Sequence, residues 1–169
     1  MPTVREATYE LLRTLGLTTV FGNPGSTEQT FLQDFPSDFT YVLGLQEASV
    51  VAMADGYAQA TGKPTLVNIH TSAGLGNAMG QIMEAWLGKA PLIITAGNQT
   101  RDMILREPYL TNLAPQLMPQ PFVKWSYEPT RSEDIPAAIM RAYITAIQPP
   151  AGPVFLSLPF GDLSQQPHS

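Results

Sequence analysis

Three side chains in this sequence combine a chemically active group with a position at the end of a short apolar segment. Ser26 follows a segment at residues 18–21, Glu47 follows one at 39–45, and His70 ends one at 64–70. A serine that meets a histidine is typical of nucleophilic hydrolysis. A carboxyl group in apolar surroundings is typical of proton exchange with a ligand. The sequence therefore offers two kinds of chemistry.

The surroundings of Ser26 fit a nucleophile poorly. The nucleophile elbow of hydrolases has glycines two positions before and after the serine, whereas Gly25 directly precedes Ser26. No acid is clearly placed to orient His70. Ser26 and Gln29 instead form a capping-box pattern, which predicts that Ser26 caps a helix reaching about Phe35. Hydrolysis stays open as an alternative, and His70 fits a catalytic role and a backbone hydrogen bond equally well.

Glu47 needs a different explanation. A carboxylate in the first turn of a helix is stabilised by the helix dipole, which accounts for an exposed acid. Apolar residues such as Leu43, Leu45 and Val50 surround Glu47, however, and indicate a buried one. A carboxyl group desolvated there would tend to carry a proton. We therefore expect Glu47 to exchange a proton with a nitrogen heterocycle bound at the ends of the strands.

Two other kinds of site find little support. The stretch "GLGNAMG" at 74–80 has G-x-G-x-x-x-G spacing, which differs from the dinucleotide fingerprint, and the next apolar segment ends without an acid for a ribose. Gly74 and Gly76 are explained as well by a tight turn and a close approach of the backbone. With two histidines, no cysteine and no acidic cluster, we expect the chain to build no metal site.

Composition restricts the possible partners. A net charge of −5 without clustered Lys or Arg argues against nucleic acid. The chain is 44% hydrophobic and only 14% charged, which suggests that a partner covers part of its surface. The lack of cysteine fits a cytoplasmic protein, and the N-terminus "MPTVREATYELL" lacks the pattern of a signal peptide. The longest apolar stretch is too short to span a membrane.

Strand and helix patterns alternate along the chain, and the strands are continuous apolar runs. This pattern predicts an α/β protein, a three-layer doubly wound fold with a parallel sheet of about six strands and helices on both faces. Ligands of such sheets bind beyond the carboxyl ends of the strands. We expect strands at 18–21, 39–45, 64–70, 91–97, 121–127 and 152–159, and helices at 3–15, 26–35, 47–61, 77–89 and 132–147, with 71–76 a loop and 98–120 irregular apart from a short helix near Met103.

The stretch from "TVFGNPGSTEQTF" to "QEASVVAMADGYAQATGKPTLVNIHTSAGLGNAMG" resembles the N-terminal, pyrimidine-binding domain of thiamine diphosphate-dependent decarboxylases. The glutamate followed by "A-D-G-Y-A" marks the superfamily. "N-P-G-S", and a histidine just before "S-A-G-x-G-N", resemble the benzoylformate decarboxylase branch. The resemblance implies one such domain at residues 1–160 and a tail at 161–169.

The family's site residues transfer by motif to this sequence. The resemblance implies that Glu47 bonds the pyrimidine ring of thiamine diphosphate, that His70 moves protons near the substrate, and that Ser26 contacts the carboxylate of a 2-oxo acid. These three would be the catalytic residues of a carboxy-lyase that converts benzoylformate to benzaldehyde and carbon dioxide. The resemblance further implies that the cofactor pocket is lined by Asn23, Pro24, Gly25, Gly74, Gly76 and Asn77, and that Leu110 joins Ser26 and His70 in binding substrate.

The resemblance also implies what must complete the site. In the family, magnesium and the diphosphate are held by another domain with a G-D-G…N motif, which these 169 residues do not contain, and the active site forms between subunits. We therefore expect a homo-oligomer or a pairing with a diphosphate-binding domain, and no activity from this chain alone. An additional metal of the family is not expected, because Leu117 and Gln120 replace its residues. A non-catalytic module and another 2-oxo acid enzyme remain alternatives.

Overall fold

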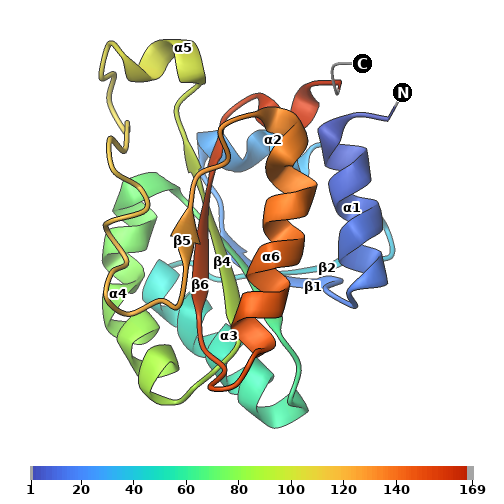
Figure 1. The fold of residues 1–169 in the computed structure, drawn as a ribbon, viewed down its shortest axis with the longest axis vertical. Helices are drawn as coiled ribbons and strands as arrows, with labels where there is room; N and C mark the ends of the chain where they lie inside the picture. Colours follow the sequence, from blue (N-terminus) through green and yellow to red (C-terminus); the bar gives the residue numbers. More distant parts are fainter. Residues whose placement is uncertain (1, 167–169) are drawn as a thin grey trace.

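The computed structural model describes residues 2–166 and consists of one central sheet between two layers of helices (Figure 1). Six strands, all parallel, lie in the order β2-β1-β3-β4-β6-β5. The predicted three-layer parallel fold is therefore confirmed. The strands are β1 (Thr19–Asn23), β2 (Thr40–Leu43), β3 (Thr65–Ile69), β4 (Leu92–Asn98), β5 (Ser126–Tyr127) and β6 (Val154–Pro159).

The helices divide between the two faces of the sheet. Helices α1 and α6 pack on one face, and α3 and α4 pack together on the other (Figure 1). Neighbouring residues of a strand enter different cores, since Ile93 joins the α1–α6 side and Ile94 the α3–α4 side. This explains why the strands are apolar throughout. The helices are α1 (Val4–Thr14), α2 (Gln29–Leu32), α3 (Glu47–Thr61), α4 (Thr71–Leu87), α5 (Arg101–Ile104) and α6 (Ile135–Ile147).

Local signals fix the start of α1 and both ends of α3. Thr3 and Glu6 form a capping box at the start of α1. The side chain of Gln46 accepts a hydrogen bond from the Ser49 N–H and so caps α3. Gly62 ends α3 with a φ of 67°, a left-handed conformation that glycine adopts without strain. The predicted helix at 47–61 is thus confirmed.

Two predicted strands differ from the structure. The segment 39–45 was expected to be buried, but β2 is an edge strand, and Leu43 and Leu45 are 60% and 90% exposed. An apolar run cannot by itself distinguish an edge strand from a central one. The segment 121–127 was expected to be a strand throughout, but only Ser126 and Tyr127 pair with β6.

The predicted loop at 71–76 is wrong, because α4 begins at Thr71. His70 is the N-cap residue, and its carbonyl accepts a hydrogen bond from the Gly74 N–H at 2.6 Å. Two glycines in one turn favour a loop by propensity. Tertiary contact overrides that preference here, since a Cβ on Gly74 would lie 3.0 Å from Glu47 Oε1 of the neighbouring helix. The glycine therefore allows α3 and α4 to approach closely.

The C-terminal segment packs on the core of the domain. The expected tail at 161–169 includes a 3₁₀ helix at Asp162–Ser164, and Leu163 is buried against the core. Gln165 accepts a hydrogen bond from the Val4 N–H through its carbonyl, so this stretch packs on the start of α1. Residues 167–169 of the expected tail lie outside the described residues. The short helix expected near Met103 is confirmed as α5.

Within residues 2–166, no helix combines the length and apolar character needed to cross a membrane.

Strand order identifies the edge of the sheet where a ligand would bind. Strands β1 and β3 are neighbours in the sheet. From β1 the chain crosses to β2 on one side, whereas from β3 it crosses to β4 on the other side. The two crossovers diverge at the carboxyl ends of β1 and β3, the topological switch point where doubly wound folds bind ligands.

Candidate functional site

The predicted site residues meet at this switch point. Asn23 is the last residue of β1 and pairs in register with Ile69, the last residue of β3, so His70 follows immediately after the strand. Glu47 is the first residue of α3, four positions after the end of β2. Three consecutive carboxyl ends of the sheet thus contribute an amide, an imidazole and a carboxyl group to one edge.

The Glu47 carboxyl group is buried, as the sequence predicted, with the residue 7% exposed. Its surroundings are less apolar than expected. Oε1 accepts a hydrogen bond from Asn23 Nδ2, and Oε2 accepts one from Asn77 Nδ2, each at 3.1 Å. Gly74 packs against the same carboxyl group. Glu47 is therefore a positioned group, because side chains from β1 and α4 fix its orientation on α3.

His70 has an orienting acid that the sequence did not reveal. Glu28 Oε2 lies 2.8 Å from His70 Nδ1, and the Glu28 side chain is only 1% exposed. The expectation that no acid orients His70 was thus wrong. It failed because Glu28 belongs to the short helical turn after β1, and only the parallel pairing of β1 with β3 brings that turn to the histidine. The imidazole itself is 20% exposed and so reaches the surface of the site.

Ser26 does not cap a helix. It is exposed, and it begins a 3₁₀ helix at Ser26–Glu28 whose N-cap residue is Gly25. The capping contact is made by Glu28, which accepts a hydrogen bond from the Gly25 N–H at 2.8 Å. Helix α2 also ends at Leu32, short of the predicted limit near Phe35. The hydroxyl of Ser26 is consequently left free for other contacts at the mouth of the site.

The remaining predicted residues differ in what they contact and in how far they are buried. Gly25 packs on the imidazole, since a Cβ there would lie 2.3 Å from His70 Nδ1. Gly76 is exposed, and a Cβ on it would meet Met118 at 3.2 Å. Leu110 is half-buried within the 98–125 segment and has a φ of 71°. Pro24 links β1 to the Gly25 turn. The structure thus unites Gly25 with His70, whereas a role for Leu110 stays a prediction.

A second polar layer lies behind the site and was not predicted. Tyr41 donates a hydrogen bond to Asn68 Oδ1, and Asn68 Nδ2 donates one to Thr95 Oγ1. Burial raises the pKa of Tyr41 well above its usual range, and the nearby charge of Glu28 raises it further. Gly22 makes room for the phenol, because a Cβ there would collide with the Tyr41 hydroxyl. One signal was available, since Asn68 interrupts an otherwise apolar strand.

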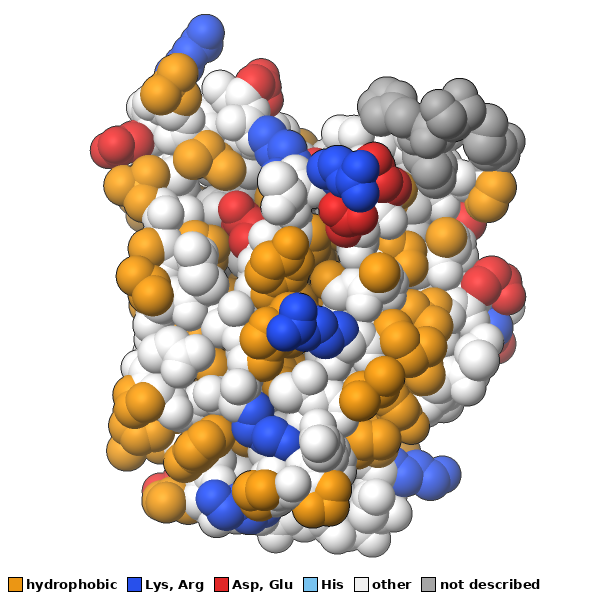
Figure 2. Space-filling view, in the orientation of Figure 1, with side chains coloured by type: hydrophobic (Ala, Val, Ile, Leu, Met, Phe, Trp, Pro, Cys, Tyr) orange, Lys and Arg blue, Asp and Glu red, His pale blue; other side chains and the backbone are white. Residues whose placement is uncertain are grey.

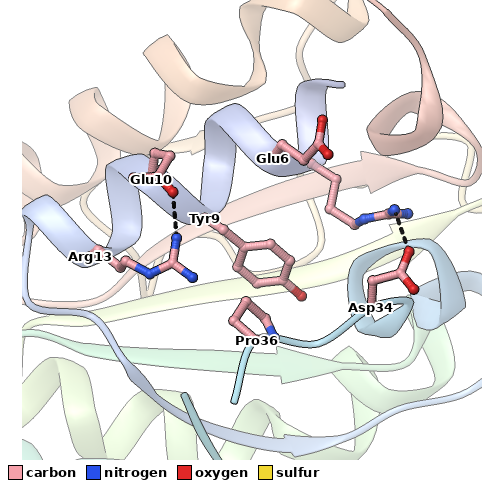
Figure 3. Close-up of a pocket in the computed structure, with 7 residues that line it drawn as sticks. Glu6, Tyr9, Glu10, Arg13, Asp34 and Pro36 are labelled. Carbon is pink, nitrogen blue, oxygen red and sulfur yellow. Dashed lines mark hydrogen bonds and ion pairs between the residues drawn. The ribbon is translucent and has the colours of Figure 1, made fainter. Parts of the chain in front are cut away.

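A hollow of about 370 Å³ beside α1 provides a contrast with this site (Figure 3). Arg5 pairs with Asp34 in it, and Arg13 pairs with both Glu10 and Asp38. Because each arginine already faces a carboxylate, the hollow has no free positive charge to attract an anion. Its lining residues include none of Asn23, Glu47 and His70. The switch point remains the candidate site.

Among residues 2–166, no group of three or more His, Cys, Asp or Glu side chains could hold a metal ion. The polar groups at the switch point are carboxylates, carboxamides and one imidazole, set between glycines. This set suits an organic ring with nitrogen donors and acceptors better than it suits a metal ion.

A known protein family matches the part of the chain that contains these side chains. The family described as "Thiamine pyrophosphate enzyme, N-terminal TPP binding domain" matches residues 2–119. The benzoylformate decarboxylase of Pseudomonas aeruginosa is 54% identical over 165 residues, which are 98% of this chain and 31% of that protein.

Two solved structures share the fold. The benzoylformate decarboxylase of Polynucleobacter necessarius superposes with a TM-score of 0.98 and 64% identity, over 100% of this chain and 32% of that one. A thiamine diphosphate-dependent 4-hydroxybenzoylformate decarboxylase of Rhodococcus jostii gives 0.95 and 48%, over 99% of this chain and 34% of that one. The chain spans about a third of the length of each relative. It belongs to the thiamine pyrophosphate enzyme family, as an N-terminal cofactor-binding domain.

Proposed function

We propose that this chain is the pyrimidine-binding part of a thiamine diphosphate-dependent decarboxylase that converts benzoylformate to benzaldehyde and carbon dioxide. The observation that carries the proposal is the buried Glu47 carboxyl group, oriented by Asn23 and Asn77 at the switch point. The 54% identity to a benzoylformate decarboxylase supports the choice of substrate. It also favours this substrate over other 2-oxo acids.

The residues at Glu47 fit an aminopyrimidine. Each Glu47 oxygen accepts one hydrogen bond from a carboxamide and keeps a lone pair for a ring nitrogen or its proton. Gly74 places no side chain against the carboxyl group, and a Cβ there would be 3.0 Å from Oε1. Glu47 would hold a proton at the ring nitrogen and exchange it during the reaction. The cofactor, when bound, supplies the carbon nucleophile and the electron sink that decarboxylation requires.

The segment after β1 and the residue after β3 would line the part of the pocket that binds the substrate. His70, partly exposed and held by Glu28, would exchange protons with the reacting carbonyl oxygen. The exposed Ser26 would donate a hydrogen bond to the substrate carboxylate. Pro24 and Gly25 would shape the wall between them. Gly76 and Asn77 would face the cofactor ring, and Leu110 would contact the aromatic group of the substrate.

Magnesium and the diphosphate need other residues. Since no acidic or histidine cluster exists among residues 2–166, we propose that magnesium is held outside this chain, by a diphosphate-binding domain. We also propose that the site is completed across a homo-oligomeric interface. The absence of cysteine supports a cytoplasmic location.

A co-expression assay tests the proposed activity. The chain is produced together with the diphosphate-binding remainder of a benzoylformate decarboxylase, and benzaldehyde is measured with thiamine diphosphate, magnesium and benzoylformate. We expect turnover, and we expect Glu47→Gln to lower kcat at least about 10²-fold, because the relay carboxyl group is lost. The matched control is Glu84→Gln, which alters an exposed glutamate of α4. Equal turnover by the two variants would refute the role of Glu47.

A further inference from the structure

Glu28 is a buried carboxylate with a full set of hydrogen-bond donors. Oε1 accepts from the Gly97 N–H at 2.7 Å and from Thr27 Oγ1 at 2.8 Å. Oε2 accepts from the Gly25 N–H and lies 2.8 Å from His70 Nδ1. A carboxylate offers about two acceptor positions on each oxygen, so four donors satisfy it. The group is therefore fixed from four directions.

Two glycines are explained by this arrangement. A Cβ on Gly97 would lie 2.5 Å from both Glu28 Oε1 and Thr27 Oγ1, and one on Gly25 would lie 2.3 Å from His70 Nδ1. Distances this short exclude any side chain. One glycine comes from β4 and the other from the loop after β1. Two separate segments of the chain thus leave space for the same carboxylate–imidazole pair.

The pair decides which nitrogen of His70 carries a proton. Three donors other than His70 already bind the Glu28 carboxylate, which can only accept hydrogen bonds. Thr27 Oγ1 gives its hydrogen to Glu28, so the Thr27 oxygen can only accept from His70 Nδ1, which is 3.2 Å away. Both neighbours of Nδ1 therefore require a hydrogen on it.

We propose that Glu28 is a positioning residue that holds neutral His70 in its Nδ1–H tautomer, so that the free lone pair lies on Nε2. Since Nδ1 faces the protein, Nε2 is the nitrogen of the part-exposed ring that can serve a ligand. The role in turnover rests on the proposed function: Nε2 accepts a proton from the reacting group and returns it, while Glu28 stabilises the imidazolium formed in between. The proton moves between Nε2 and the ligand oxygen, and none leaves Glu28.

Nitrogen spectroscopy of the 169-residue chain tests the tautomer without reference to activity. Long-range proton–nitrogen correlation spectra separate protonated from unprotonated ring nitrogens, and His168→Gln identifies the His70 signals, because the sequence has only two histidines. At a pH where the imidazole is neutral, we expect His70 to carry its proton on Nδ1. In Glu28→Gln, whose amide can donate to Nδ1, we expect the Nδ1 signal to shift toward the unprotonated position.

Thr27→Val is the matched control, since it removes the other contact to Nδ1 but keeps the carboxylate. We expect it to leave the proton on Nδ1, and backbone amide spectra would verify that each variant is folded. A wild-type His70 protonated on Nε2 would overturn the proposal. A folded Glu28→Gln variant that keeps the wild-type tautomer would also overturn it. The same holds if the Nδ1 signal shifts in Thr27→Val but not in Glu28→Gln. If Glu28→Gln does not fold, the tautomer of His70 is read from the Glu28→Ala variant and from the wild-type protein, and the same outcomes support or overturn the proposal.

Kinetics of the co-expressed enzyme add the functional arm. We expect Glu28→Gln to lower kcat by about tenfold or more and to change KM by less than about twofold, because substrate contacts remain. A predicted tautomer together with no decarboxylation by the wild type would contradict the proposed function alone. A wrong tautomer in an active enzyme would contradict the role of Glu28 alone.

Discussion

At the residue scale, two buried glutamates at one edge of the sheet differ in their hydrogen bonding. Glu28 has donors at all four acceptor positions, so it has no capacity for a ligand. Glu47 accepts one hydrogen bond on each oxygen from within the described residues and keeps the capacity for more. The number of hydrogen bonds that each carboxyl group already accepts thus fits the positioning role proposed for Glu28 and the proton exchange proposed for Glu47.

Two tyrosines with raised pKa values, Tyr9 and Tyr41, predict how stability depends on alkaline pH. Burial raises the pKa of Tyr9 and of Tyr41 above the value of about 10 expected in the unfolded chain. Because the folded state holds the phenol protons more tightly, this contribution to stability is complete below pH 10 and is lost as the pH rises above it. We expect the free energy of unfolding in urea to fall above pH 10 by up to about 1.4 kcal/mol per pH unit for each tyrosine.

Single substitutions identify the tyrosines responsible. Tyr9→Phe should reduce the slope above pH 10, whatever it costs at neutral pH through the lost hydrogen bond to the Phe31 carbonyl. Tyr109→Phe is the control, because it removes the hydroxyl of a tyrosine that is 88% exposed. An identical slope in the wild type and in Tyr9→Phe would contradict this assignment.

At the element scale, the site depends on where helices begin. Strand β3 ends at Ile69 and helix α4 begins at Thr71, so His70 is the single residue between them and the N-cap of the helix. Helix α3 begins at Glu47, which the Gln46 cap and the helix dipole both favour. Each chemical group thus occupies a strand–helix junction, where the backbone is held on both sides.

The junction of α5 with the C-terminal 3₁₀ helix depends on one buried ion pair. Arg101 donates from Nε and a guanidinium NH₂ to Asp162, which is 2% exposed, and also to the Pro129 carbonyl. We expect Arg101→Gln to lower the free energy of unfolding in urea by about 1–3 kcal/mol, because it strands a buried carboxylate. This is below the usual cost of breaking a buried pair, since the arginine side chain is 37% exposed.

The control for Arg101 is a surface pair with similar geometry. Arg131 donates to Asp134 at 2.9 Å and 3.0 Å from a side chain that is 65% exposed. Arg131→Gln should leave the unfolding curve unchanged, because solvent screens this pair. Equal losses in the two variants would show that burial of the carboxylate does not determine the effect.

At the scale of the whole molecule, much apolar surface stays uncovered. Figure 2 shows hydrophobic side chains spread over the face that carries β5 and α6, among scattered charges. On the opposite layer, α3 exposes Met53 and Tyr57 and α4 exposes Met83 and Leu87, each pair spaced by one helical turn. Each of the two helices thus exposes apolar side chains, which is typical of surfaces that a partner covers.

We expect the exposed apolar side chains of α4 to lie in a homo-oligomeric interface. Sedimentation at high concentration should show association of the chain, and the double variant Met83→Ser and Leu87→Ser should reduce it. Ile144→Ser is the control, since Ile144 is 52% exposed on α6, on the other face of the sheet. A purely monomeric wild type at high concentration would count against self-association.

An isolated half of a pocket should bind its cofactor weakly. Calorimetry of the 169-residue chain with thiamine diphosphate and magnesium should give a Kd well above about 1 μM, since no described residue cluster binds the metal ion. Benzoylformate should stay intact in the same mixture. Glu47→Gln should weaken the residual binding further. Micromolar affinity, or benzaldehyde formation by the chain alone, would contradict the requirement for a second domain.

The sequence by itself determined the layered fold and the position of Glu47. Continuous apolar runs predict strands covered on both faces, and Ile93 with Ile94 shows that both faces are indeed core. The capping residues predict the ends of α1 and α3 because these signals act within a few residues. Glu47 could be singled out because the pattern of strand and helix places it at a carboxyl edge.

Only the tertiary structure decided what surrounds the two acids. Asn23 and Asn77 reach Glu47 from elements 24 and 30 residues away, and Glu28 reaches His70 across 42 residues. No local pattern records such pairings, since they depend on the order of strands in the sheet. For the same reason, the start of α4 at Thr71 was missed: the packing of Gly74 on Glu47 outweighs its local preference for a loop. Short-range capping and periodicity are written in sequence, whereas contacts across the sheet exist only once the strands have paired.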